Sequence, residues 1–305
     1  MRALTKAVVD VIWAAVEPLL PRSPDRHPLG CHRPRVCDRL CLRGIIWRLV
    51  LGCSWRSVEI LLDNAVSDTT LRSRRDEWVA AGVFDQIAAE AIAAWDRIMG
   101  LRLGDVCIDG SVHKAPCGGP GTGKSPVDRR KSGWKWSLAV DAAGVPVAWC
   151  ADGANRNDIM LFEPTMAELE RQGLHHDIDT IHLDRGYWGA RVDAAADAAG
   201  ICDLARPPKR KPSAGPAEPA TAPLGLRWHV ERANSWLAGY GQLRRNTDRR
   251  PEHRQAQLAL AVTLIITLKL IDHHDRGNGP VRFFVYLAVV VFIGCGRRSG
   301  RRSGR

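Results

Sequence analysis

The chain has 305 residues, a net charge of +11, and apolar and charged fractions of 45% and 25%. This composition is typical of a soluble globular protein and excludes a disordered or collagen-like chain. Residues 276–305 contain seven arginines and no acid, so most of the positive charge lies in the tail and a basic pI alone does not indicate a nucleic-acid partner. Nine cysteines without a CxxC pair favour buried thiols in a reducing cytoplasm, and Asp10 and Glu17 interrupt the first apolar stretch, which argues against a signal peptide.

Residues 1–100 predict an all-α domain. Amphipathic stretches are expected as helices at 4–21 and 38–52, with Ser54 capping a helix at 55–62 and Ser67 or Asp68 capping another at 69–82. The last two helices, joined by a short turn, predict a helix-turn-helix. Three arginines lie near the start of its second helix, where a recognition helix meets DNA: Arg72, Arg74 and Arg75. The alternative is a basic face of an ordinary helical bundle.

From residue 101 the pattern changes to alternating strands and helices. The predicted order is strand, strand, strand, helix, strand, helix, strand, helix, which indicates an α/β fold with a mixed sheet and helices on its faces. The expected elements are strands at 105–110, 134–141, 145–153, 178–184 and 201–205, and helices at 157–173, 189–200, 226–240 and 251–272. We predict one domain over 101–275 with a Pro-rich loop or linker at 206–223.

Residues 276–305 form a separate apolar and basic extension. Its apolar run, 283–295, is too short to span a bilayer comfortably, so no membrane is expected, although a tail anchor is the alternative.

The stretch from Gly118 to Ser125 has the literal spacing of a phosphate-binding P-loop. A P-loop needs a buried strand directly before it and a helix directly after it. Here Pro116 and polar residues precede the glycines, and the chain after Pro126 heads into a strand, so a P-loop hydrolase is disfavoured. The loop instead offers cations for the phosphates of a polyanion: Lys124, Arg129, Arg130, Lys131 and Lys135. Trp134 and Trp136 alternate with Lys135 and would stack on bases or pack in the core, with packing favoured for at least one of them.

Two carboxylates are predicted at the ends of neighbouring strands, Asp109 and Asp184. Hard oxygen ligands in this arrangement suit Mg²⁺. Glu231, on the helix at 226–240, is the natural third ligand. Any single one of these acids has the alternative of being a solvated surface carboxylate.

Several stretches together resemble the bacterial insertion-sequence transposases of the DDE type, in the large group numbered families four and five (insertion-sequence-five-like). They are "GIIWRLVLGCSWRSV", "IDGSVHKAPCGGPGTG", "DRRKSGWKWSLAVDAAGVPV", "DGANRND", "LDRGYW" and "HVERANSWLAGYGQLRRNTDRR". The resemblance covers nearly the whole chain up to Asp272. Leu224 and Ala238 depart from the family, which has a Tyr and a Lys or Arg at these positions, and the tail has no counterpart in it.

The resemblance implies a ribonuclease H-like catalytic core in which Asp109, Asp184 and Glu231 hold two Mg²⁺ ions, with Mn²⁺ as a substitute. The implied activity is strand cleavage at the ends of the insertion sequence, followed by strand transfer. Its substrate is double-stranded DNA, both element ends and target. We expect a homodimer in the synaptic complex and a cytoplasmic, nucleoid-associated protein. Further phosphate contacts are expected from Arg185, Arg227, Arg232, Arg244 and Arg245. Two alternatives stay open, a nuclease with the same core and an inactive DNA-binding remnant.

Overall fold

The structure is a computed structural model that describes residues 2–21, 35–201, 203–208 and 225–278. Most of the predicted linker at 206–223 and the apolar run of the tail lie outside the described residues. The chain divides into two compact units. We call them the helical unit (Met1–Met99, Tyr240–Gln242, Ala259–Arg305) and the sheet unit (Gly100–Gly239, Leu243–Leu258). The predicted domain limits, 1–100 and 101–275, stay a prediction.

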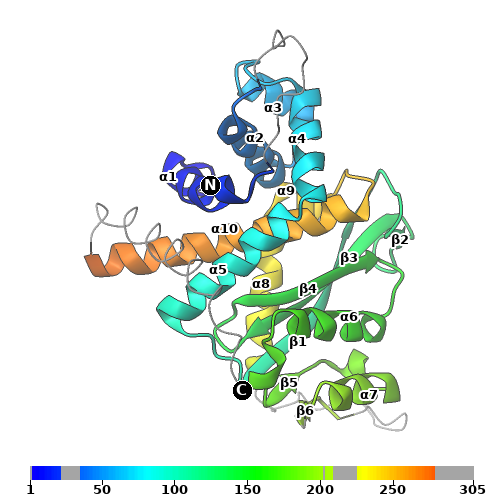
Figure 1. Ribbon diagram of the computed structural model, residues 1–305. Helices are drawn as coiled ribbons and strands as arrows, with labels where there is room; N and C mark the ends of the chain where they lie inside the picture. The colour runs from blue at the N-terminus through cyan, green and yellow to red at the C-terminus, as the bar shows by residue number, and fades with distance from the viewer. Residues whose placement is uncertain (1, 22–34, 202, 209–224, 279–305) are drawn as a thin grey trace, which may run out of the picture. The chain divides into compact units, whose positions relative to one another are not determined.

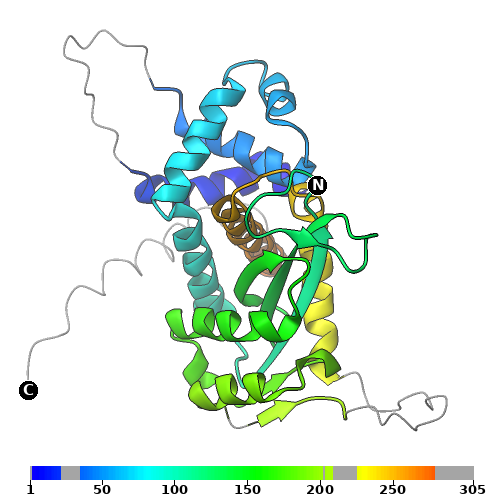
Figure 2. The same ribbon diagram turned by 90° about the vertical axis from the view of Figure 1, so that its right-hand side faces the viewer.

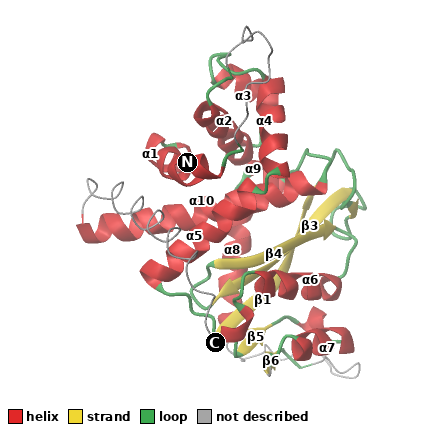
Figure 3. Cartoon of the chain, viewed as in Figure 1, coloured by secondary structure: helices red, strands yellow, loops and turns green. Residues whose placement is uncertain are grey.

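The N-terminal part of the helical unit contains only helices and turns in its described residues, as Figure 3 shows. Ser54 caps α3 by accepting from the Ser57 amide at 3.0 Å, and Ser67 caps α4 by accepting from the Thr70 amide at 3.2 Å. Both capping predictions are confirmed, with Ser67 and not Asp68 at the second helix. The α-helices are α1 (Lys6–Val16), α2 (Asp38–Leu51), α3 (Trp55–Leu61), α4 (Asp68–Ala80) and α5 (Val83–Met99).

The helices α2, α3 and α4 pack on one another around a buried apolar centre. Leu42 and Ile46 of α2 and Leu71 and Trp78 of α4 are fully buried. Residues 62–67 connect α3 to α4. The predicted helical N-terminal region is therefore confirmed.

The sheet unit contains a mixed six-stranded sheet with β3 paired to β1 and β4, and β1 paired to β5 (Figure 1). The β1–β3 and β3–β4 pairs are antiparallel, whereas β1–β5 and β5–β6 are parallel. This is the predicted ribonuclease H-like order, with one short additional strand, β2. The strands are β1 (Asp105–Lys114), β2 (Gly123–Lys124), β3 (Ser132–Asp141), β4 (Pro146–Gly153), β5 (Thr180–His182) and β6 (Asp203–Ala205).

Helices cover both faces of this sheet (Figure 2). Thr165 of α6 (Asp158–Arg171) donates to the Ser137 hydroxyl, while Asn234 of α8 (Trp228–Ala238) accepts from the Trp136 indole. Since neighbouring residues of a strand point to opposite faces, α6 and α8 lie on opposite sides of β3. The α6 side, with α7 (Ala190–Ala198), carries the apolar core, which includes Val106, Ile108 and Phe162.

Two strands end at positions different from the predicted ones. β1 continues five residues past Asp109, because its pairing with β3 extends to Lys114 opposite Gly133. Asp109 therefore lies in mid-strand, opposite Leu138. β5 ends at His182, two residues before Asp184. Both aspartates remain next to the β1–β5 pairing, which joins Cys107 to His182.

The last two helices in the described part of the chain are α9 (Gly241–Arg244) and α10 (Pro251–Asn278). Over Pro251–Arg276, α10 is long and apolar enough to cross a membrane by length and composition. However, 72% of its most apolar window is buried inside the protein, which is the environment of a core helix.

Candidate active site

Asp109 lies on the side of β1 that faces α8. The side-chain amide of Asn234 donates to its Oδ2 at 3.4 Å. The pKa of Asp109 is raised to about 6, chiefly by burial; the charges of Asp184 and Asp158 also raise it, while the hydrogen bond from the Gly110 amide and the charge of Arg227 act against the rise. A carboxyl group perturbed by burial and by two like charges is a common mark of a functional site.

Asp184 lies beside Asp109, just after β5. Its Oδ1 accepts from the Gly186 amide at 2.6 Å and caps the short helix η4 (Arg185–Tyr187). Burial raises the pKa of the Tyr187 phenol, and so do the charges of Asp158, Asp109 and Asp184. Three carboxylates are therefore close enough to act on one buried phenol.

Glu231 lies on α8, with a side chain that is 53% exposed and 3.7 Å from Arg227 Nη2. Residues four and three positions apart share a face of a helix, so Arg227, Glu231 and Asn234 project from the same side of α8. Asn234 brings that side to Asp109. Nevertheless, among the described residues no three acidic, His or Cys side chains lie close enough to hold a metal ion. The structure thus pairs Asp109 with Asp184 and leaves Glu231 apart from them.

A fourth acid, Asp158, lies next to these residues and was not predicted as part of the site. It is the first residue of α6, which Asn157 caps. Its Oδ1 accepts from Lys135 Nζ at 3.0 Å, and its carboxylate lies directly against Gly110, where a Cβ would collide with it. The sequence signals the start of the helix, but the proximity to β1 depends on tertiary packing.

Lys135 was predicted to contact DNA phosphates, yet it is only 6% exposed. Its ammonium group is engaged by Asp158 and by the Arg156 carbonyl, each at 3.0 Å. The neighbouring Trp134 and Trp136 are fully buried, and their indoles donate to the Leu243 carbonyl and to Asn234. Core packing is confirmed for both tryptophans, which leaves neither available for base stacking.

The P-loop geometry is absent from the loop that resembles it, and this loop is described throughout. After β2, the Ser125 amide donates to the Lys131 carbonyl at 2.8 Å and closes a tight turn that leads directly into β3. A strand therefore follows where a P-loop has a helix, as predicted. Four cations of this segment are exposed: Lys124, Arg129, Arg130 and Lys131.

The glycines of this loop permit close packing on the segment before α10. Gly119, at φ +106°, leaves no room for a Cβ against the Arg249 carbonyl. The Asn246 amide donates to the Lys114 carbonyl at 2.8 Å, and Arg254 donates to the Pro120 carbonyl. These contacts join two basic segments into what we call the basic surface. Its members are all exposed: Lys114, Lys124, Arg129, Arg130, Lys131, Arg244, Arg245, Arg249 and Arg250.

The remaining predicted phosphate contacts of the sheet unit differ in accessibility. Arg185 is exposed directly after Asp184. Arg232 stacks between Trp228 and Trp236, at 4.2 and 4.9 Å from the ring centroids, and donates to the Ala143 carbonyl at 3.0 Å. Arg232 therefore holds α8 to the β3–β4 turn, while Arg185 and Arg227 stay beside the carboxylates.

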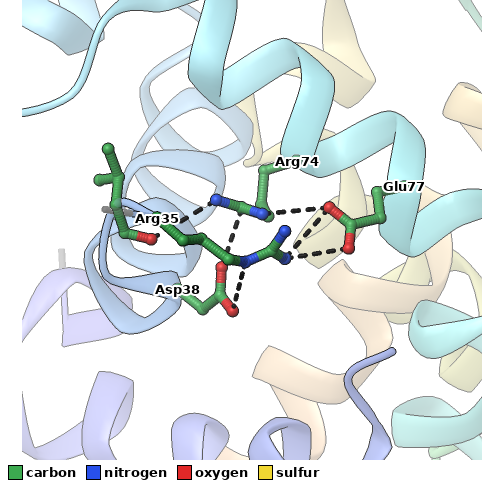
Figure 4. Close-up of polar contacts among 5 residues, drawn as sticks. Arg35, Asp38, Arg74 and Glu77 are labelled. Atoms are coloured by element: carbon green, nitrogen blue, oxygen red, sulfur yellow. Dashed lines mark hydrogen bonds and ion pairs between the residues drawn. The ribbon is translucent and has the colours of Figure 1, made fainter. Parts of the chain in front are cut away.

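Of the three arginines predicted to read DNA, two are buried in the helical unit. Arg74 Nε lies 2.8 Å from Asp38 Oδ1 and its Nη1 lies 3.1 Å from Glu77 Oε2, and Arg35 contacts the same two acids (Figure 4). This network connects the start of α2 to α4. Arg75 is 8% exposed and lies over the Trp55 ring. Arg72 has an exposed side chain, 3.2 Å from Asp68.

Comparisons with known proteins match both parts of the chain. Residues 102–268, which include Asp109, Asp184 and Glu231, match the family model described as "Transposase DDE domain". The chain belongs to the DDE transposase family. Residues 8–88 match the model described as "Putative transposase of IS4/5 family", which places the transposase in that group.

Two curated relatives come from an insertion element of Burkholderia cepacia. The "Putative transposase for insertion sequence element IS402" is 34% identical over 163 residues, which cover 51% of this chain and 74% of that protein. The "Insertion element IS402 uncharacterized 16.2 kDa protein" is 29% identical over 124 residues, covering 40% of this chain and 84% of that protein. No solved structure matches the chain significantly.

Membership in this family defines the protein as an enzyme of DNA cleavage and transfer. It also implies dependence on a divalent metal ion. Because a transposase acts on DNA, it further implies a location in the cytoplasm. The six cysteines in the part of the chain that the structure describes are all free thiols, consistent with a reducing compartment.

Proposed function

We propose that this transposase binds the two ends of its own insertion sequence, cuts them and joins them to target DNA, with Asp109, Asp184 and Glu231 as its catalytic carboxylates. The observation that supports this assignment is the pairing of Asp109 and Asp184. Asp109 lies on β1 and Asp184 lies two residues after the adjacent parallel strand β5, 75 positions away in sequence, and each carboxylate raises the pKa of the same neighbour, Tyr187.

The chemistry of this donor set fits a hard divalent cation, and we propose Mg²⁺, with Mn²⁺ as a substitute. Asp109 and Asp184 would hold it from the sheet, and Glu231, whose half-exposed side chain pairs with Arg227 at 3.7 Å, would complete the set from α8 by turning toward them. Metal ions held by these three carboxylates would supply an activated water as nucleophile and would stabilise the negative charge that develops on the phosphate.

The protein's own groups would position the DNA for this chemistry. Arg185 and Arg227 flank the carboxylates, where their charges would neutralise the phosphate that is cut. The 3′-hydroxyl released by cleavage would stay at the same carboxylates and attack the target strand without a covalent protein intermediate. The basic surface would hold the flanking duplex, since exposed cations on two joined segments provide a salt-dependent attraction to its backbone.

Recognition of the ends would belong to the domain at 1–100, through α3 and α4. Arg72 remains available there, and Arg56 of α3 adds a second exposed cation at 68% side-chain exposure. Two copies would assemble as a homodimer because a synaptic complex contains two ends. Association with the nucleoid would follow from non-specific binding to chromosomal DNA.

The experiment is a cleavage and strand-transfer assay on DNA carrying the terminal repeats that flank this gene. Asp109→Asn, Asp184→Asn and Glu231→Gln each preserve volume and remove one ligand charge, so cleavage should fall below detection while end binding persists. Asp197→Asn and Glu170→Gln, at exposed positions on α7 and α6, are the matched controls and should cleave as the wild type does. Near-normal cleavage by any of the three site variants would remove that residue from the site.

The same assay separates the alternatives. A nuclease with the same core would cut the ends and yield no strand-transfer product. An inactive remnant would bind the ends without cutting them in either Mg²⁺ or Mn²⁺.

A further inference from the structure

A hydrogen-bonded chain of three side chains runs from β3 through α8 to Asp109. Trp136 is fully buried and its indole nitrogen lies 2.8 Å from Asn234 Oδ1. Asn234 is 8% exposed, and its Nδ2 lies 3.4 Å from Asp109 Oδ2. Because this amide is almost completely buried, its hydrogen-bond partners inside the protein determine its orientation.

The indole determines which way the amide points. An indole N–H can only donate, so the atom of Asn234 that faces it must be the oxygen. The NH₂ group then necessarily faces Asp109, whose ionised carboxylate only accepts. Each polar atom in the chain therefore has a partner of the opposite kind, and rotating the amide by 180° would place two donors against each other at Trp136.

Strand register explains how the three residues meet. Asp109 and Ser111 point to the same face of β1, and Ser111 lies directly opposite Trp136 of β3. The Ser111–Trp136 pair lies two residue pairs along from the Asp109–Leu138 pair, so Trp136 and Asp109 point to the same face of the sheet, the one that α8 covers. Asn234 spans this pair from α8 and lies three positions after Glu231, on the same side of the helix.

We propose that Asn234 is a positioning residue for the metal site, one that holds the Asp109 carboxylate in a single orientation, and that Trp136 is the anchor that orients Asn234. Its NH₂ group donates to Oδ2, and a carboxylate held in this way would present its other oxygen to a cation. Because Asn234 and Glu231 share a helix face, the same contact sets the distance between Glu231 and Asp109. This inference rests on the proposed role of Asp109 as a metal ligand.

The test measures metal binding without catalysis. Full-length protein is bound to end DNA that has already been cut, and free Mn²⁺ is followed by electron paramagnetic resonance during a titration. Asn234→Leu keeps the volume and removes the donor. Partners that orient a ligand typically contribute 10- to 100-fold to metal affinity, so we expect a loss of about that size. The Mg²⁺ concentration for half-maximal cleavage should rise by a similar factor.

A matched control separates positioning from packing. Trp134 is a fully buried residue of the same strand as Trp136, and its indole donates to the Leu243 carbonyl at 3.2 Å. Trp134→Phe should lower the melting temperature as Trp136→Phe does, without changing Mn²⁺ affinity. If Asn234→Leu does not fold, Asn234→Ser replaces the amide with a shorter hydroxyl that cannot bridge Trp136 and Asp109, without adding an apolar group. Trp136→Phe should reproduce part of the loss, since it releases the amide oxygen.

The outcomes distinguish this inference from the proposed function. If Asp109→Asn abolishes Mn²⁺ binding while Asn234→Leu and Asn234→Ser bind it within about twofold of the wild type, Asn234 has no positioning role. If Asp109→Asn itself binds Mn²⁺ normally, the assignment of Asp109 fails, and the inference fails with it.

Discussion

Lys135 Nζ and Asp158 Oδ1 form an ion pair of 3.0 Å directly over Gly110, the residue that follows Asp109. The lysine thus holds an acid beside the site and does not contact solvent. Lys135→Met should lower strand cleavage about tenfold or more, because Asp158 loses its partner, and should leave the salt dependence of DNA binding unchanged.

Lys124 provides the contrast, because its side chain is exposed. Lys124→Ala should weaken DNA binding modestly and lower the slope of log affinity against log salt by about 1, the value for one lost phosphate contact. Salt titrations of both lysine variants and an ATPase assay measure these effects. An unchanged slope for Lys124→Ala, together with ATP turnover that the mutation abolishes, would restore the nucleotide-hydrolase alternative.

Gly110→Ala should abolish cleavage while the protein stays folded. The added Cβ would collide with the Asp158 carboxylate and displace it from β1. Gly104→Ala is the control, since its Cβ would meet only the end of the Asp179 side chain, at 3.2 Å. Circular dichroism and the cleavage assay report the two properties separately, and a Gly110→Ala protein that cleaves normally would contradict a role for Asp158 at the site.

Arg74→Ala should lower the stability of the protein, whereas Arg72→Ala should weaken its binding to DNA. Removing Arg74 leaves Asp38 and Glu77 without their buried partner. The free energy of unfolding should fall by about 2 kcal/mol. This is less than the loss for a fully buried pair, because the side chains of the two acids are 22% and 30% exposed. Arg72→Ala should change stability by no more than about 0.5 kcal/mol and weaken binding to end DNA. Urea unfolding and gel shifts measure the two effects. A stable Arg74→Ala protein with a specific DNA-binding defect would return Arg74 to the DNA interface.

His113 should make the sheet unit less stable in acid. Its ring stacks on Trp136 at 3.8 Å, and burial lowers its pKa from 6.5 to about 4. Between pH 6.5 and 4 the unfolded chain therefore takes up a proton on His113 that the folded protein does not. The free energy of unfolding has its full value above about pH 6.5 and falls by about 3 kcal/mol as the pH drops to 4.

The variant His113→Phe keeps an aromatic ring on Trp136 and cannot titrate. Its melting temperature should fall less than that of the wild type between pH 7 and 4.5. Equal losses in the two proteins would show that another group causes the acid sensitivity.

Local patterns in the sequence predicted the elements of this fold well. Ser54 and Ser67 signal their helices by capping chemistry that involves only neighbouring residues, and the order of strands and helices follows from periodicity. The length of β1 was wrong because polar residues after Asp109 hide its continuation, which depends on pairing with β3. Strand pairing is a property of two distant segments, so a single run of residues does not reveal it.

The accessibility of charged residues was the weakest part of the sequence prediction. Arg72 and Arg74 look alike in sequence, yet Arg74 is buried because Asp38 and Glu77 surround it. Lys135 looks like its neighbours in the basic loop, but strand alternation turns it to the α6 face. The spacing of three residues between Glu231 and Asn234 indicates that both lie on one side of a helix. The contact of Asn234 with Trp136 could not be predicted in this way, because it depends on the register of the sheet.

The contact between Gly119 and Arg249 has a consequence for how the protein is made. Four of the nine cations of the basic surface are translated more than a hundred residues after the other five, and Arg254, later still, donates to the Pro120 carbonyl of the glycine loop. Domains fold from the N-terminus as the chain leaves the ribosome. A nascent chain that ends before α10 carries the basic residues of both segments but lacks Arg254, and with it a contact that holds the glycine loop in place. The basic surface is therefore completed only near the end of synthesis, whereas the domain at 1–100 is translated first, so prematurely terminated products that contain it would compete with the full-length enzyme for the element's ends.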